Sequence, residues 1–280
     1  MRQINADDIR NAVSRLCVEA NIFLNKDILT AINKALTYEE SEQARFALEM
    51  IAKNAEIGRS ERLPVCQDTG MAVVFVDMGQ DARVIGGFLG DAINDGVRLG
   101  YQNGYLRKSV VSDPISRENT NDNTPAIIHY DIVPGDTLRI TVAPKGFGSE
   151  NMSAIKMLKP SDGREGVINF VYETVMAAGS NPCPPVIVGV GVGGTFEKAA
   201  LLSKRALLLP VRAVNDNPFW ANAERELLLK INANGVGAAG LGGLTTALAV
   251  HINTFATHIA GLPVAVNIGC HVTRHAETIL

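Results

Sequence analysis

Three of the four cysteines lie in loops whose residue types suit a metal site. Cys66 lies in the sequence VCQDTG, Cys183 in NPCPP and Cys270 in GCH. Proline and glycine hold the backbone shape of such loops, and nearby backbone amides stabilise a negatively charged cluster. Three thiolates can bind three corners of an iron–sulfur cube and leave the fourth iron open as a Lewis acid. The spacing leaves two alternatives open. The three could be unrelated buried thiols, or they could bind zinc, although the chain has no C-x-x-C or H-x-x-H pair.

Cys17 has a different setting. Apolar residues recur around it at three- and four-residue intervals, at Ile9, Val13, Leu16 and Ala20. This spacing places them on one face of a helix. We therefore predict that Cys17 is a buried core thiol, since an unmodified cysteine packs as a small hydrophobic residue.

Two glycine-containing segments are candidate anion sites. The sequence GVGVGG at 189–194 fits G-x-G-x-x-G, which binds a dinucleotide pyrophosphate when it joins a strand to a helix. The acidic residue at the matching distance, Asp216, lies in a polar turn, so we interpret the segment as a tight strand-to-helix turn. The sequence PKGFGSEN at 144–151 offers backbone N–H groups and Lys145 to an anion but lacks the P-loop pattern. Its alternative interpretation is a surface turn.

The histidines suggest a site only by their spacing. His251 and His258 are seven residues apart, which is two helical turns, so they could share a helical face within and just after the helix predicted over 244–257. His271 and His275 flank the third cysteine loop. A single histidine is more often structural than catalytic, so these residues remain candidates.

The composition argues against several classes of protein. The chain has 280 residues, a formal charge of −3 and scattered basic residues, and its pI is about 6.0. We expect no nucleic-acid or membrane partner. The first ten residues are charged and unlike a secretion signal, and no apolar run reaches the roughly 18–20 residues that span a bilayer. Four cysteines are too few for a disulfide scaffold, so we expect a reducing, cytoplasmic location.

The pattern of elements predicts an α/β fold in one continuous domain over residues 1–280, with residues 1–60 mainly helical. Strands are predicted at 71–76, 126–132, 137–143, 185–192 and 264–268. Helices are predicted at 83–101, 165–178, 195–208, 224–231 and 244–257, with a long polar loop at 113–125. The turn VPGD joins the strands at 126–132 and 137–143.

Five segments in order carry a resemblance to a known family. They are VCQDTG at 65–70, YLRKSVV at 105–111, KGFGSEN at 145–151, NPCPP at 181–185 and GCH at 269–271. Together they resemble the iron–sulfur (class I) fumarate hydratases, in the part that forms their N-terminal domain or separate α subunit. The resemblance runs from about residue 8 to the end of the chain. The related L(+)-tartrate dehydratase α subunit shares the CQDTG and CPP elements, whereas LRKSVV and GSEN are more like fumarase.

The resemblance implies a 4Fe–4S cluster held by Cys66, Cys183 and Cys270, and a small dicarboxylate or hydroxy-dicarboxylate substrate. The residues at family positions that contact substrate are Gln67, Asp68, Arg107, Gly146, Ser149 and Asn151. Asp68 and His258 are the candidate acid/base residues, and the identity of the base stays open. The implied reaction is the reversible hydration of fumarate to L-malate.

The resemblance also implies a partner. Single-chain members carry a further C-terminal domain, whereas this chain ends ten residues after Cys270. We therefore expect a β subunit that supplies that domain, in an α2β2 assembly, and no activity from this chain alone. Two rival functions remain: the α subunit of L(+)-tartrate dehydratase, and a non-enzymatic iron–sulfur sensor, which would have no need of Arg107, Gln67 or Asp68.

Overall fold

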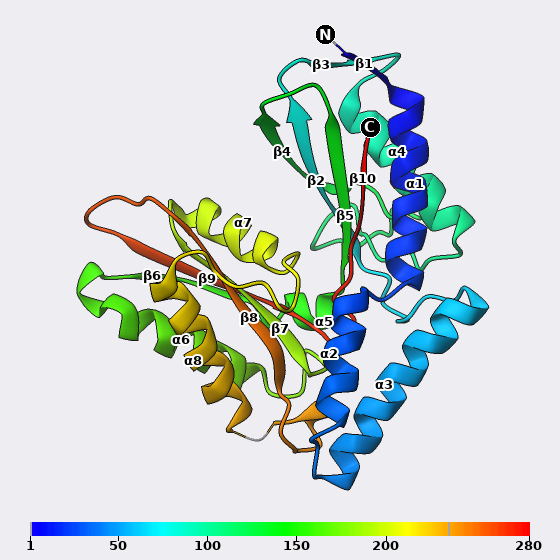
Figure 1. Ribbon diagram of the computed structural model, residues 1–280. Coiled ribbons are helices and arrows are strands. Elements are labelled where there is room, and N and C mark those ends of the chain that lie inside the picture. Colours follow the sequence, from blue (N-terminus) through cyan, green and yellow to red (C-terminus); the bar gives the residue numbers. More distant parts are fainter. Residues whose placement is uncertain (1, 235) are drawn as a thin grey trace. The chain divides into compact units, whose positions relative to one another are not determined.

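The chain forms two compact units in the computed structural model, which describes residues 2–234 and 236–280 (Figure 1). Unit 1 comprises residues 2–24, Ala55–Phe147 and Arg274–Leu280. Unit 2 comprises Asn25–Asn54 and Gly148–Thr273. Each unit has its own sheet and its own core, and the α/β class is confirmed. The single domain predicted over residues 1–280 stays a prediction. Gly235, in the glycine-rich stretch before the last predicted helix, lies outside the described residues.

Helices fill most of the first sixty residues, as their apolar spacing predicts. They are α1 (Ala6–Ile22), α2 (Lys26–Leu36) and α3 (Glu42–Glu61). The side chain of Asn5 caps α1 by accepting a hydrogen bond from the backbone N–H of Asp7. The apolar face of α1 predicted from its spacing is buried, including Ile9 and Leu16.

The sheet of unit 1 has the strand order β10-β5-β2-β4. Its strands are β2 (Met71–Gly79), β4 (Ile127–Val133), β5 (Leu138–Lys145) and β10 (Ala276–Ile279). The predicted turn joins β4 to β5, but these strands are not neighbours. Strand β2 lies between them, parallel to β4 and antiparallel to β5.

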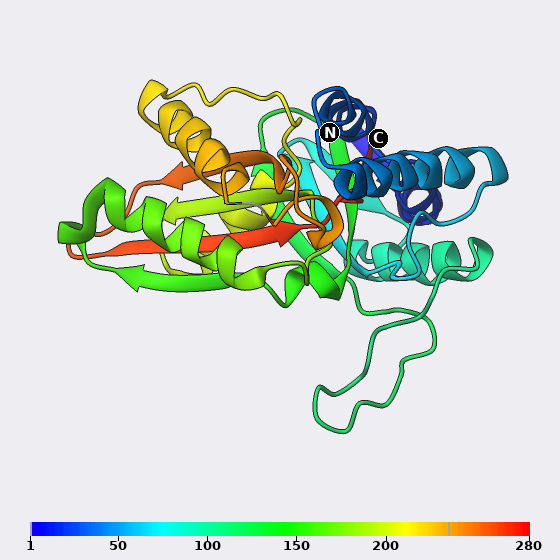
Figure 2. The same cartoon turned by 90° about the horizontal axis from the view of Figure 1, so that it is seen from below.

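Two helices supply the core of unit 1. Side chains of α1 and of α4 (Leu89–Asn103) pack with Val74 and Ile140 of the sheet. The helix predicted from residue 83 begins only at Leu89, because β3 (Ala82–Ile85) pairs in parallel with β1 (Arg2–Asn5). After α4, the loop that leads to β4 extends away from the rest of unit 1 (Figure 2).

The sheet of unit 2 has the strand order β6-β9-β7-β8. Its strands are β6 (Ala154–Leu158), β7 (Val186–Gly193), β8 (Ala247–Phe255) and β9 (Leu262–Gly269). Helices α6 (Gly163–Ala178) and α8 (Pro218–Asn232) pack on one face, against valines and isoleucines of the strands. Helix α7 (Phe196–Ala206) lies on the other face (Figure 1). Short helical turns occur at α5 (Phe147–Glu150), Pro160–Asp162 and Ala238–Gly240.

The glycines of GVGVGG serve helix packing. Gly189 and Gly191 lie within β7 and face α7, and a Cβ at Gly191 would lie 2.0 Å from the carbonyl oxygen of Ala199. The missing side chains let the backbone of α7 lie directly on the strand. Only Gly193 and Gly194 form the strand-to-helix turn that the motif predicts, with φ angles of 92° and 70°.

The prediction of a helix over 244–257 is wrong. The segment forms the edge strand β8, which pairs in parallel with β7 from Val186–Ala247 to Gly193–Phe255. Its outer edge is covered by side chains, since Glu224 accepts a hydrogen bond from the backbone N–H of Ile252 at 2.7 Å. Within the described residues, no helix combines the length and apolar character needed to cross a membrane.

Candidate functional site

Cys66 lies in the loop between α3 and β2 in unit 1. The residue is partly exposed, and its sulfur lies 3.5 Å from Oε1 of the exposed Gln67. Cys17 is fully buried in the core of the same unit, and this burial raises the pKa of its thiol to about 12. The structure therefore confirms Cys17 as a core thiol and leaves Cys66 accessible to a ligand.

The loop after Cys66 is held from inside by hydrogen bonds to its backbone. The hydroxyl of Tyr101 donates to the carbonyl oxygens of Thr69 and Gly70, at 2.7 and 3.0 Å. The side chain of Asn123 also donates to the Gly70 carbonyl, at 3.1 Å. Gly70 has φ of 74°, and a Cβ there would lie 2.7 Å from the backbone nitrogen of Lys145. Only glycine therefore permits this approach to β5.

Asp68 joins two of the predicted substrate-binding segments. Its Oδ1 accepts the N–H of Gly70 at 2.9 Å, and its Oδ2 accepts the N–H of Phe147 at 2.9 Å. A Cβ at Gly146 would lie 3.2 Å from Oδ2, so a glycine eases this close approach. The structure thus brings Cys66, Gln67, Asp68 and Gly146 together in unit 1.

Arg107 begins the long loop beside the same segment. Its carbonyl oxygen accepts a hydrogen bond from Thr69 Oγ1 at 3.0 Å, while its side chain is exposed. Among the described residues, none forms a hydrogen bond or ion pair with its guanidinium group. An exposed guanidinium of this kind can bind a carboxylate through two parallel hydrogen bonds.

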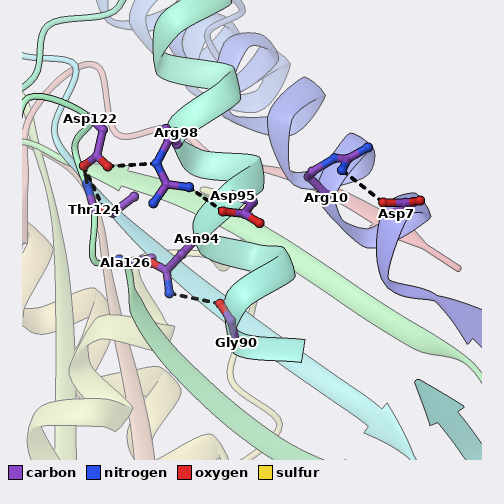
Figure 3. A network of polar contacts seen from close by, with 9 residues as sticks. All are labelled: Asp7, Arg10, Gly90, Asn94, Asp95, Arg98, Asp122, Thr124 and Ala126. Atoms are coloured by element: carbon purple, nitrogen blue, oxygen red, sulfur yellow. Dashed lines mark hydrogen bonds and ion pairs between the residues drawn. The ribbon is translucent and has the colours of Figure 1, made fainter. Parts of the chain in front are cut away.

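The far end of this loop is tied to α4 by a polar network (Figure 3). Arg98 Nε donates to Asp122 Oδ2 at 2.9 Å, and Asn94 Oδ1 accepts the N–H of Ala126 at 2.9 Å. Partial burial alone would raise the pKa of Asp122. Hydrogen bonds from Thr124 and the ion pair with Arg98 outweigh burial and lower that pKa to about 2.

Unit 2 brings the other two cysteines to one end of its sheet. Cys183 precedes β7 and Cys270 follows β9, in a register that pairs Ile187 with Gly269. The carbonyl oxygen of Cys183 accepts the N–H of His271 at 3.2 Å and lies 2.9 Å from its Nδ1 atom. The positive φ of Cys183, 54°, turns the backbone at this point.

Ser149 and Asn151 lie on either side of Glu150, which bonds to the same end of the sheet. Glu150 Oε2 accepts a hydrogen bond from Asn267 Nδ2 at 3.0 Å, and Ser153 Oγ accepts the N–H of Ile268 at 3.2 Å. Ser149 is buried and Asn151 is exposed. The predicted loop residues on this side therefore gather near the strand that ends before Cys270.

His258 does not join them. It follows β8, beside the Gly193 end of β7, whereas Cys183 and Cys270 lie at the Val186 end. Eight residues of strand separate the two ends, a distance of roughly 25 Å. His258 instead lines a groove of about 390 Å³ with Trp220 and Ile259. The predicted shared helical face with His251 is wrong, because both residues belong to or follow a strand. His251 is buried, and burial lowers its pKa.

The donor set suits an iron–sulfur cluster by its chemistry. Thiolates are the usual cluster ligands, and Cys66, Cys183 and Cys270 are all at least partly exposed and outside disulfides. Cys66 belongs to unit 1, and the other two belong to unit 2. Within the described part of the chain, no group of three or more His, Cys, Asp or Glu side chains is arranged to hold a metal ion.

The chain combines two α/β units with three cysteine-bearing loops, which adjoin β2, β7 and β9. The sequence model of the fumarate hydratase (Fumerase) family matches residues 10–279, and the chain belongs to this family. The resemblance seen in the five segments is thereby confirmed.

Curated relatives match nearly the whole chain. The chain is 42% identical over 279 residues to the putative L(+)-tartrate dehydratase subunit alpha of Methanocaldococcus jannaschii, covering 96% of each. It is 33% identical over 252 residues to the L(+)-tartrate dehydratase subunit alpha of Escherichia coli strain UTI89, covering 89% of this chain and 82% of the relative. For the protein of that name in strain K12, identity is 31% over 258 residues, covering 91% and 84%.

Proposed function

We propose that the chain is the α subunit of an iron–sulfur hydro-lyase that reversibly hydrates fumarate to L-malate. Its membership of the fumarate hydratase family supports the hydro-lyase class. The observation that carries the proposal is the fixed loop at Cys66, where Asp68 links the cysteine segment to Gly146 and Phe147. A second candidate is L(+)-tartrate dehydration, which the names of the relatives favour.

Cys66, Cys183 and Cys270 are the proposed ligands of a 4Fe–4S cluster. When bound, a cluster with three thiolate ligands supplies a Lewis-acidic iron to an oxygen of the substrate. The chain contributes thiolates and fixed backbone around them. Cys17 takes no part, since it lies in the core of unit 1.

Polar groups in and near the cysteine-bearing loops would bind the substrate. Arg107 would bind a substrate carboxylate with its exposed guanidinium. Gln67 presents an amide beside the Cys66 sulfur and would bind the hydroxyl or a carboxylate oxygen. Gly146, Ser149 and Asn151 would form the loop over the ligand, where backbone N–H groups favour an anion.

Asp68 is our preferred acid/base residue. Each of its carboxylate oxygens accepts one backbone N–H and keeps a second lone pair for a proton. His258 remains a predicted acid/base residue on the resemblance alone. Its place at the opposite end of the sheet from Cys183 and Cys270 argues for Asp68.

We propose that activity requires a β subunit, in an α2β2 assembly, within the cytoplasm. The names of the relatives, each a subunit alpha, support a partner chain. We propose no nucleic-acid or membrane partner.

The test is turnover by the cluster-reconstituted chain with and without a β chain of the family. We expect fumarate to form from L-malate only when both chains are present. We expect the same pair to dehydrate L(+)-tartrate, which gives oxaloacetate, more slowly. Faster dehydration of L(+)-tartrate than of L-malate would establish the second candidate. Turnover of neither acid by a cluster-loaded pair would contradict the hydro-lyase proposal, and rapid turnover by this chain alone would contradict the need for β.

A further inference from the structure

Arg274 is a buried cation directly beneath the Cys66 loop. Its side chain belongs to unit 1 and the residue is only 4% exposed. Its Nη2 donates to the carbonyl oxygen of Asp68 at 2.7 Å. Nε and Nη2 also donate to Asn21 Oδ1, at 3.3 and 3.1 Å. Arg274 therefore ties the backbone two residues after Cys66 to helix α1.

Asn21 holds the other side of the cysteine. It is fully buried near the end of α1, and its carbonyl oxygen accepts the N–H of Val65 at 2.9 Å. Its side-chain Nδ2 donates to the carbonyl oxygen of Cys17 at 2.9 Å, which fixes the orientation of the amide. Residues before and after Cys66 are thus bound to one buried pair, Asn21 and Arg274.

Tyr101 continues this support along the loop. Burial raises the pKa of Tyr101, so its hydroxyl keeps the proton that it donates to Thr69 and Gly70. With Arg274, three successive carbonyl groups are held from the inside, those of Asp68, Thr69 and Gly70. The C=O and N–H of a trans peptide point in opposite directions, so the Thr69 N–H is turned away from Arg274.

The cost of burying a guanidinium makes a mere packing role a poor account of Arg274. Removing a charge from water is unfavourable unless its hydrogen bonds are used, and an apolar side chain would fill the same space at lower cost. A guanidinium has several donors in a rigid plane and can hold two acceptors at a fixed angle. Its acceptors include the Asp68 carbonyl and the Asn21 amide oxygen.

We propose that Arg274 is a positioning residue for the Cys66 loop, acting with Asn21 and Tyr101. It follows Cys270 by four residues, so one segment of chain carries both a predicted cluster ligand and the support of another. The identity of the ligand that Cys66 binds rests on the proposed function. The support itself is a property of the chain without a cluster.

The experiment measures the loop in the cluster-free full chain. The variants are Arg274→Gln, Arg274→Lys and Tyr101→Phe, with Arg139→Gln as the matched control, because Arg139 is a half-exposed arginine of the same unit. Hydrogen exchange is followed in the peptide 64–70, with β5 as the reference for unfolding of unit 1. Alkylation of Cys66 is followed against Cys183.

We expect Arg274→Gln to speed exchange of 64–70 by about tenfold, the effect of losing a hydrogen bond to a charged group. Alkylation of Cys66 should speed up by less, because this residue is already partly exposed. Arg274→Lys keeps the charge and one donor direction, so it should recover part of that loss. Tyr101→Phe should speed exchange by about threefold or more, since it removes one neutral donor. Arg139→Gln should change neither readout.

Unchanged exchange and alkylation in both Arg274→Gln and Tyr101→Phe, with β5 still protected, would overturn the proposal. If Arg274→Gln also exposes β5, the result of Tyr101→Phe is decisive, because this variant removes a single oxygen. Faster exchange confined to 64–70 in Tyr101→Phe then supports the proposal, and unchanged exchange overturns it. Reconstitution of the cluster in the wild-type chain separates this result from the proposed function. If the wild-type chain takes up no cluster, the proposed function is contradicted, while the exchange data on the cluster-free chain still decide the role of Arg274.

Discussion

Replacing Asp68 by asparagine tests whether its carboxylate joins the two loops. The carboxylate uses one oxygen for the N–H of Gly70 and the other for the N–H of Phe147. Asparagine keeps one oxygen and turns an NH2 group toward the second N–H. One hydrogen bond to a charged group is lost and two donors face each other. Since such a bond contributes about 1.5–3 kcal/mol and Asp68 is partly exposed, we expect a loss of about 2 kcal/mol in the free energy of unfolding.

The assay is urea unfolding followed by circular dichroism, with hydrogen exchange at the Phe147 amide. Asp113→Asn is the matched control, because a single oxygen of Asp113 accepts both of its backbone N–H groups. Asparagine retains that oxygen, so the control should unfold like the wild type. Asp68→Asn with wild-type stability and unchanged protection of Phe147 would refute the linking role. Full turnover by a cluster-loaded Asp68→Asn variant would also remove Asp68 from the proposed chemistry.

Three further outcomes follow from the packing and the charges. Gly191→Ala should destabilise the chain by about 1–3 kcal/mol in urea unfolding, because the new methyl group meets the backbone of α7. Gly148→Ala, whose Cβ has only ordinary contacts, should not, and equal stability of the two would contradict the packing account. Asp122→Asn should lower stability at pH 7. Because the folded pKa of about 2 lies below the usual value of about 3.9, this difference should shrink as pH falls from about 4 toward 2, and a constant difference would count against the ion pair. Iodoacetamide at neutral pH should label Cys183 and not Cys17, because burial raises the pKa of the Cys17 thiol and keeps it protonated. Equal labelling of the two would contradict the assignment of Cys17 to the core.

The sequence predicts best where one local pattern decides the structure. The apolar stripe of α1 identifies Cys17 as a core residue, and the turn residues around the other cysteines place them in loops. Local pattern fails at β8, where an alanine-rich apolar run suits a helix. Pairing along the whole length of β7 makes it a strand, and this partner is distant in sequence.

The support of the Cys66 loop shows a second limit. Asn21 and Tyr101 lie in helices whose patterns indicate only burial, and Arg274 follows the last cysteine without a motif. Their common role depends on hydrogen bonds between residues up to 253 positions apart. The one available signal was the polar type of Asn21 next to an apolar helical face, since a buried amide needs partners.

The central claim is that Cys66, Cys183 and Cys270, and not Cys17, bind a cluster. Iron and acid-labile sulfide should be measured per chain after anaerobic reconstitution of the wild type and of the four single cysteine-to-alanine variants. We predict a full complement in the wild type and in Cys17→Ala, and loss of cluster iron in each of the other three. Full iron in a variant of Cys66, Cys183 or Cys270, or a loss confined to Cys17→Ala, would contradict the claim.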